Sequence, residues 1–190
     1  MTFRLALKTG PAAEPITTAE AKKQLNVTTT DDDSYIDSLV VAARQYTEQV
    51  TRRALITQTW NLYLDEFVSP VLLPRPPLSS VSSIKYIDTD GVEQTTVTGV
   101  YTVDTDAEPG HVFTAYNQAW PTARQVEKAI DIEYVAGYGD AAAVPQGLKH
   151  AMLLLIAHWY EHRETVNDFQ VYDVPMGYAA LVWPYRVMSF

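Results

Sequence analysis

The sequence predicts an α+β protein, with a helical body, a small inserted antiparallel β-domain and an extended C-terminal tail. In residues 17–53, apolar side chains recur at helical spacing. The segment 144–163 is apolar on nearly every face of a helix. Between them, apolar residues recur at every second position, which is typical of half-buried strands. Helices near both ends and strands between them favour segregated elements over alternating βα units.

Two N-terminal helices are expected in residues 1–56, after an irregular or extended lead-in over residues 1–15. Thr17 and Glu20 have the spacing of a capping box, so the first helix should begin there and end near Leu25. A second helix is expected over residues 32–53, because carboxylates at its start favour the positive end of the helix dipole. One stripe of this helix is apolar and comprises Ile36, Leu39, Val40, Ala43, Tyr46 and Val50.

Residues 57–136 are expected to form the inserted β-domain. The first strand should follow Thr57, where Trp60, Leu62 and Leu64 alternate with polar residues. A hairpin turn is indicated at Asp90-Gly91. The other expected strands are residues 81–88, 92–97, 101–104, 111–115 and 129–136.

Residues 137–164 should contain a buried central helix, over residues 144–163. Pro145 lies near its first turn, a favoured place for proline. From Leu148 to Tyr160 the segment is apolar on nearly every face, which predicts burial on all sides. This apolar run is shorter than the roughly 20 residues that a bilayer requires, so we expect a soluble core helix.

Residues 165–190 form the predicted tail. It has no clear period and few charges, and it is too rich in aromatic residues for a disordered segment. Aromatic residues are enriched in protein interfaces. Composition alone leaves two interpretations open, a docking segment or a segment that packs against its own domain.

Charge and composition exclude several classes of function. The chain has no cysteine, which excludes disulfides and thiolate chemistry. Its 14 basic residues are scattered and its net charge is −9, whereas proteins that grip DNA phosphates need clustered Lys and Arg. We therefore expect no stable nucleic-acid binding. The N-terminal residues show no signal-peptide pattern.

One segment suggests an enzyme. His158, Glu161 and His162 match H-x-x-E-H, the zinc-binding pattern of inverted zincin peptidases. The histidines would bind zinc and Glu161 would be the general base, but a third protein ligand is needed. The downstream carboxylates are Glu164, Asp168 and Asp173, and none lies in a clear second helix. Two histidines stabilised at a helix C-terminus explain the pattern better, so a small zinc metallopeptidase is only the alternative hypothesis.

Five segments together resemble the head-to-tail connector (adaptor) proteins of long-tailed bacteriophages and gene transfer agents. In chain order they are EPITTAEAKKQL (14–25), AARQYTEQVTRRALITQTW (42–60), LPRPPLSSVSSIKYIDTDG (73–91), YVAGYGDAAAVPQGLKHAMLLLIAHWYEHRE (134–164) and VPMGYAALVWPYRV (174–187). Their order and spacing extend over some 170 residues, and the segment least like the family is 104–128.

The resemblance implies a structural virion protein rather than an enzyme, with no cofactor and no membrane association. Such proteins form a ring, expected to be dodecameric, beneath the portal at the head–tail junction. They join the portal to the next neck or tail-completion protein, and DNA passes through without specific binding. Assembly is expected in the host cytoplasm. The C-terminal segment is expected to dock onto the portal through Tyr178, Leu181, Trp183, Pro184, Tyr185 and Arg186, with Trp183 and Tyr185 as anchors.

A cyclic ring requires two different, complementary surfaces on each subunit. The helix over residues 32–53 is expected to expose a mixed-charge face that pairs with a neighbouring subunit. The residues predicted for this face are Arg44, Glu48, Arg52 and Arg53. Acidic side chains that face a channel would repel DNA phosphates, which suits a conduit.

Overall fold

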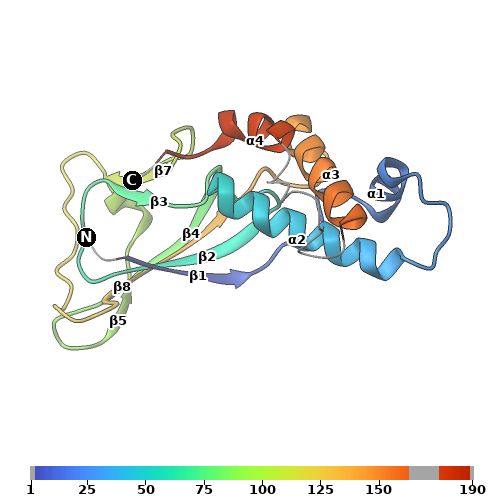
Figure 1. The fold of residues 1–190 in the computed structure, drawn as a ribbon. Helices are drawn as coiled ribbons and strands as arrows, with labels where there is room; N and C mark the ends of the chain where they lie inside the picture. Colours follow the sequence, from blue (N-terminus) through green and yellow to red (C-terminus); the bar gives the residue numbers. More distant parts are fainter. Residues whose placement is uncertain (1–2, 163–175, 189–190) are drawn as a thin grey trace. The chain divides into compact units, whose positions relative to one another are not determined.

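The structure is a computed structural model that describes residues 3–162 and 176–188. The chain folds into two compact units (Figure 1). The β unit comprises the first strand, up to Pro11, together with residues 57–138, and the helical unit comprises residues 12–56 and the chain from Gly139 onward. Over the described ranges, no helix is both long enough and apolar enough to cross a membrane.

The β unit contains two antiparallel sheets. The larger has the order β1-β2-β8-β4-β5, with β1 Phe3–Thr9, β2 Gln58–Leu64, β8 Ile130–Ala136, β4 Leu78–Ile87 and β5 Glu93–Thr95. The smaller has the order β3-β7-β6, with β3 Val71–Leu73, β7 Gly110–Thr114 and β6 Tyr101–Asp104, and a short 3-10 turn, Thr98–Val100, precedes β6. The predicted antiparallel β-domain is therefore present.

The core of the β unit follows the period-two pattern of its strands. In β8, Ile130, Ile132 and Tyr134 are fully buried and alternate with partly exposed residues. Tyr134 lies in this core and donates a hydrogen bond of 2.8 Å to the carbonyl of Pro74, and burial raises the pKa of its hydroxyl. The two sheets meet at Gly110 of β7, where any side chain would overlap Leu78 of β4.

The lead-in differs from the prediction, which assigned all of residues 1–56 to the helical body. Phe3–Thr9 forms β1, an edge strand of the larger sheet in the β unit. Its partner is β2, and the register pairs Phe3 with Leu64. No local pattern reveals this strand, because the strand with which it pairs lies some sixty residues away along the chain. The short strand β3 was likewise not expected.

The helical unit contains α1 Thr18–Leu25, α2 Asp33–Thr51, α3 Gln146–Glu161, α4 Met176–Val182 and a closing 3-10 turn, η2 Trp183–Tyr185. The capping box is confirmed: the Glu20 N–H donates to Thr17 Oγ1, and the Thr17 N–H donates to the Glu20 carboxylate at 2.7 Å. This backbone hydrogen bond lowers the pKa of Glu20. The α1–α2 pair is further joined by an ion pair between Lys22 and Asp33.

Helix α3 is the central helix of this unit and contacts α1, α2 and α4 (Figure 1). Its buried residues are Leu148, Ala151, Met152, Leu155 and Ile156, at helical spacing. Leu153 and Leu154 are only partly buried. Burial on all sides was therefore the wrong expectation, because the neighbouring helices do not surround α3 completely.

The buried carboxylate of Glu48 on α2 links the chain before α1 to the chain after α2. Its Oε1 accepts a hydrogen bond of 2.9 Å from the Leu55 N–H, and its Oε2 accepts one of 2.9 Å from Arg44. Arg44 also donates to Glu14 at 2.7 Å. Burial alone would lower the pKa of Arg44, but its hydrogen bond to Glu14 and the nearby carboxylates raise it above its usual value.

We predict that Glu48→Ala lowers the free energy of unfolding by about 3 kcal/mol, because it leaves the buried guanidinium of Arg44 without one of its partners. Gln49→Ala, at an exposed position on the same helix, should change it by less than about 0.5 kcal/mol. Chemical denaturation of both variants measures this difference. A Glu48→Ala protein that unfolds like its parent would show that the network contributes nothing to folding.

Candidate docking surface

The segment from Met176 to Met188 is fixed to the helical unit by buried side chains of α4. Tyr178 is only 2% exposed, and its hydroxyl donates to Thr47 Oγ1 at 3.2 Å. Its ring lies 5.6 Å from that of Tyr46, and burial raises the pKa of Tyr178 to about 12. Val182, one turn later, is also buried. These contacts place α4 firmly against its own unit.

Backbone contacts fix the residues that follow α4. Arg53 Nε donates a hydrogen bond of 2.6 Å to the carbonyl of Tyr185, and the Val187 N–H donates one of 3.0 Å to the carbonyl of Thr51. The Tyr185 ring lies against Gly147 at the start of α3, where a Cβ would approach its hydroxyl to 3.2 Å. The end of α2 and the start of α3 thus hold this turn in one conformation.

Several side chains of this anchored segment remain in solvent. We call Trp183, Pro184, Arg186 and Met188 the C-terminal cluster. Trp183 is 62% exposed and Met188 is 73% exposed. The Arg186 guanidinium lies 5.2 Å from the centroid of the Trp183 ring, within the range of a cation–π interaction. The result is an exposed aromatic and cationic surface on a well-anchored turn.

The six residues predicted to bind the portal fall into three environments. Trp183, Pro184 and Arg186 are exposed and belong to the C-terminal cluster. Leu181 and Tyr185 are partly buried. Tyr178 is buried against α2, so it holds the segment in place and presents no free surface. The tail is also partly helical rather than extended over its described length, because α4 packs on α3.

The expected mixed-charge face on α2 is not present as predicted. Arg44, Glu48 and Arg53 are all less than 10% exposed, because each binds a group distant in sequence or at the helix end. Only Arg52, in the left-handed C-cap position of α2, is exposed. Exposure of the first three was therefore wrong, and a subunit contact through Arg52 stays a prediction.

The proposed zinc ligands also have a structural explanation. The rings of His158 and His162 are tilted by 32° with their centroids 4.8 Å apart, and His162 Nδ1 lies 3.0 Å from the carbonyl oxygen of His158. Glu161 is exposed. Among residues 3–162 and 176–188, no three His, Asp or Glu side chains come together in a way that could hold a metal ion. Glu164, Asp168 and Asp173 lie outside the described residues.

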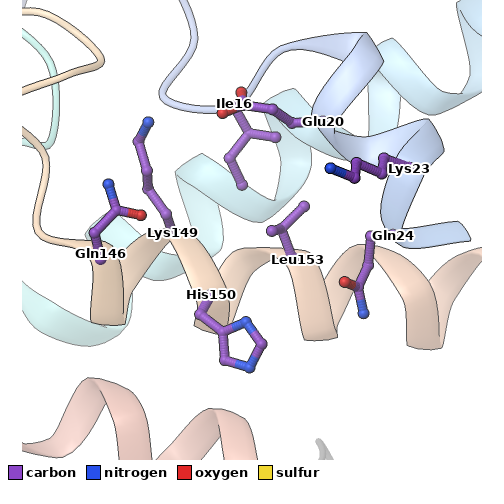
Figure 2. A pocket seen from close by; sticks show the side chains of 8 residues that line it. All are labelled: Ile16, Glu20, Lys23, Gln24, Gln146, Lys149, His150 and Leu153. Carbon is purple, nitrogen blue, oxygen red and sulfur yellow. The ribbon is translucent and has the colours of Figure 1, made fainter.

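A pocket of about 370 Å³ lies between α1 and α3 (Figure 2). Ile16 and Leu153 are its apolar lining residues, and Lys23 and Lys149 each contribute an amine. Its other lining residues are Glu20, Gln24, Gln146 and His150. Serine, threonine and cysteine are absent from these lining residues.

Comparison with known proteins identifies the family. The model of the family described as "Head completion protein" matches residues 14–170. The chain belongs to the head completion protein family. The match ends before α4, so the C-terminal cluster lies beyond the part of the chain that the family model covers. A comparison with curated protein sequences gives no match.

Solved structures of gene transfer agent (GTA) particles agree with this family. A chain in the neck of an empty GTA particle, computed with C6 symmetry, is 25% identical, with a TM-score of 0.81 over 98% of this chain and 97% of that chain. A chain in the virion of a native GTA particle is 25% identical, with a TM-score of 0.80 over 98% and 96%. A chain in a native neck computed with C12 symmetry is 24% identical, with a TM-score of 0.77 over 100% and 97%, and shows the shared fold.

The family and these structures identify a structural protein of the neck. Nothing in the comparisons supports the metallopeptidase alternative. Docking through the aromatic C-terminal segment of this head completion protein stays a prediction, and the sequence missed two features of that segment's surface. It did not distinguish the buried Tyr178 from the exposed Trp183, and it did not single out Met188. Both need the packing of α4, which no local pattern reveals.

The buried Tyr178 and the exposed Trp183 should differ in what they contribute to stability. Tyr178→Ala should lower the free energy of unfolding by about 3 kcal/mol, because it leaves a cavity beside α2 and an unpaired Thr47 hydroxyl. Trp183→Ala should change it by less than about 0.5 kcal/mol, because this ring is mostly in solvent. Thermal and chemical denaturation measure both values. Equal losses for the two variants would contradict the anchored arrangement of this segment.

Proposed function

We propose that this chain forms a ring in the neck at the head–tail junction of a virion and binds the portal through the C-terminal cluster. The ring would join the DNA-filled head to the next neck or tail-completion protein and leave a channel for DNA. Its role is structural rather than catalytic, and its assembly would take place in the host cytoplasm. The observation that supports portal binding most strongly is the exposed Trp183 on a turn held by buried neighbours.

Rigid presentation favours binding at this cluster. Tryptophan, tyrosine and arginine dominate the energetic centres of protein interfaces, and a surface that is already ordered loses little entropy on binding. The turn that displays Trp183 is fixed by Arg53 and Thr51 at the end of α2. Trp183 and Arg186 therefore require no rearrangement of α4 to meet a partner.

The ring is supported by the empty GTA neck, which was computed with C6 symmetry and contains a chain to which this chain is 25% identical. Sixfold symmetry is compatible with six or twelve subunits, and a dodecamer is our expectation. The charge of the chain suits a conduit for DNA. With 23 acidic and 14 basic residues, the subunit repels phosphates overall, so DNA would slide without the tight binding that a basic channel gives.

The decisive variant is the double substitution Trp183→Ala with Arg186→Ala. It should weaken binding to purified portal at least about 30-fold, the loss that corresponds to a strong interface residue. Binding is measured by titration of labelled portal, and thermal denaturation shows that the fold is retained. The matched control is Tyr116→Ala, an aromatic residue 91% exposed in the β unit, which should bind like the parent.

Two outcomes would overturn portal docking through this cluster. One is normal portal binding by a folded Trp183→Ala, Arg186→Ala protein. The other is an equal loss of binding in the Tyr116→Ala control, which would place the contact in the β unit.

A further inference from the structure

The larger sheet of the β unit ends in two unlike edges. Strand β1 pairs only with β2, and strand β5 pairs only with β4, so each has one side without a strand partner in the described chain. The backbone groups on such a side are available to another chain. We call residues 3–9 the β1 edge and residues 88–97, which include β5, the hairpin edge.

The β1 edge is apolar on the face that elsewhere forms the core. Phe3 and Leu7 lie opposite Leu64 and Trp60 of β2, so their side chains point to the same face of the sheet. Leu64 is 1% exposed, whereas Phe3 is 46% and Leu7 is 50% exposed. The residues that bury this face of the sheet at β2 therefore do not extend over β1. An uncovered apolar edge is a liability for an isolated subunit and is typical of an assembly surface.

The hairpin edge has a similar apolar exposure at the opposite end of the sheet. Val92 and Val97 flank β5 and are 54% and 70% exposed. All three residues of β5 are exposed. One subunit thus presents two separate edges, each with exposed apolar side chains. A cyclic ring requires two such surfaces on each subunit, because each subunit contacts the preceding and the following subunit through different surfaces.

The two edges have opposite charge. The β1 edge contains Arg4 and Lys8 and no acidic residue. Residues 88–97 of the hairpin edge contain Asp88, Asp90 and Glu93 and no basic residue, and the guanidinium of Arg124 lies beside Gly91 at the turn. Two copies of the β1 edge would repel each other, and so would two hairpin edges, whereas one of each kind attracts. The charges thus oppose a symmetric dimer and favour head-to-tail contact.

Intrachain ion pairs do not prevent this contact. Arg4 binds Glu127, and both side chains are about half exposed or more. Lys8 binds Glu133, with the lysine side chain 52% and the glutamate side chain 26% exposed, and Glu93 binds Lys85, with side chains 64% and 42% exposed. Exposed pairs of this kind contribute little to stability, so their members remain able to take a second partner.

We propose that the β1 edge of one subunit packs against the hairpin edge of the next copy of this chain around the ring. The contact brings Phe3 and Leu7 near Val92 and Val97, and it sets Arg4 and Lys8 against Asp90 and Glu93. It rests on the proposed ring and identifies a surface by which the subunits associate. The β unit then takes part in assembly, while the C-terminal cluster of the helical unit remains available for the portal.

Directed cross-linking tests the contact. Because the natural chain has no cysteine, single substitutions define each cross-link without ambiguity. Leu7→Cys and Val92→Cys proteins are mixed at a concentration where rings are present, or on portal, and treated with a short bismaleimide that tolerates a small error in register. We expect covalent heterodimers in the mixture and little product from either variant alone. The control mixture, Leu7→Cys with Tyr116→Cys, should give little product.

Charge exchange provides an independent test. Arg4→Glu with Lys8→Glu, and separately Asp90→Lys with Glu93→Lys, should each reduce the yield of rings at least about tenfold. An equimolar mixture of the two proteins should restore rings with alternating subunits, because every contact then joins opposite charges. Damage within one chain cannot explain this rescue, since each chain retains its own substitutions.

The outcomes separate the contact from the ring itself when the mass of each sample is measured. Rings without the Leu7–Val92 product, or homodimers of the Leu7→Cys protein, overturn the proposed contact and leave the proposed function standing. A product equally abundant with Tyr116→Cys, or no rescue in a mixture of folded charge variants, also overturns it. Monomers under all conditions, with and without portal, overturn both proposals.

Discussion

The helical unit depends on the hydrogen bonds of the buried Glu48 carboxylate. Through the Leu55 N–H the carboxylate fixes the chain that leaves α2, and through Arg44 it reaches Glu14 on the chain that approaches α1. Hydrogen-bonded partners on every side make the burial of these charges tolerable. The same end of α2 supplies Arg53 and Thr51, which hold the turn after α4. Packing at one helix end thereby determines how the C-terminal cluster is presented.

The proposed function of this neck protein depends on its surfaces. The surfaces that matter are those that the fold leaves incomplete: an aromatic and cationic cluster on an anchored turn, and a sheet whose two edges are unpaired and oppositely charged. Each lies within a single unit. In the proposed ring, one surface binds a different protein and the others bind copies of the same chain.

Local patterns predicted most of the elements, and distant contacts account for what they missed. The Thr17–Glu20 capping box located the start of α1, and the alternation in Ile130–Ala136 predicted β8. In contrast, β1 depends on pairing with β2, and Arg44 and Glu48 looked exposed because their partners cannot be seen from helical spacing alone. Tyr178 and Trp183 are similar in sequence context, yet the packing of α4 buries only the first. Family resemblance indicated the neck, but it could not identify which side chains reach solvent.

Electron cryomicroscopy of the purified protein bound to purified portal tests the central claim most directly. The account predicts a closed ring of sixfold or twelvefold symmetry in which Trp183 and Arg186 contact the portal. Absence of a ring, or a ring whose C-terminal cluster faces away from the portal and remains in solvent, would contradict it.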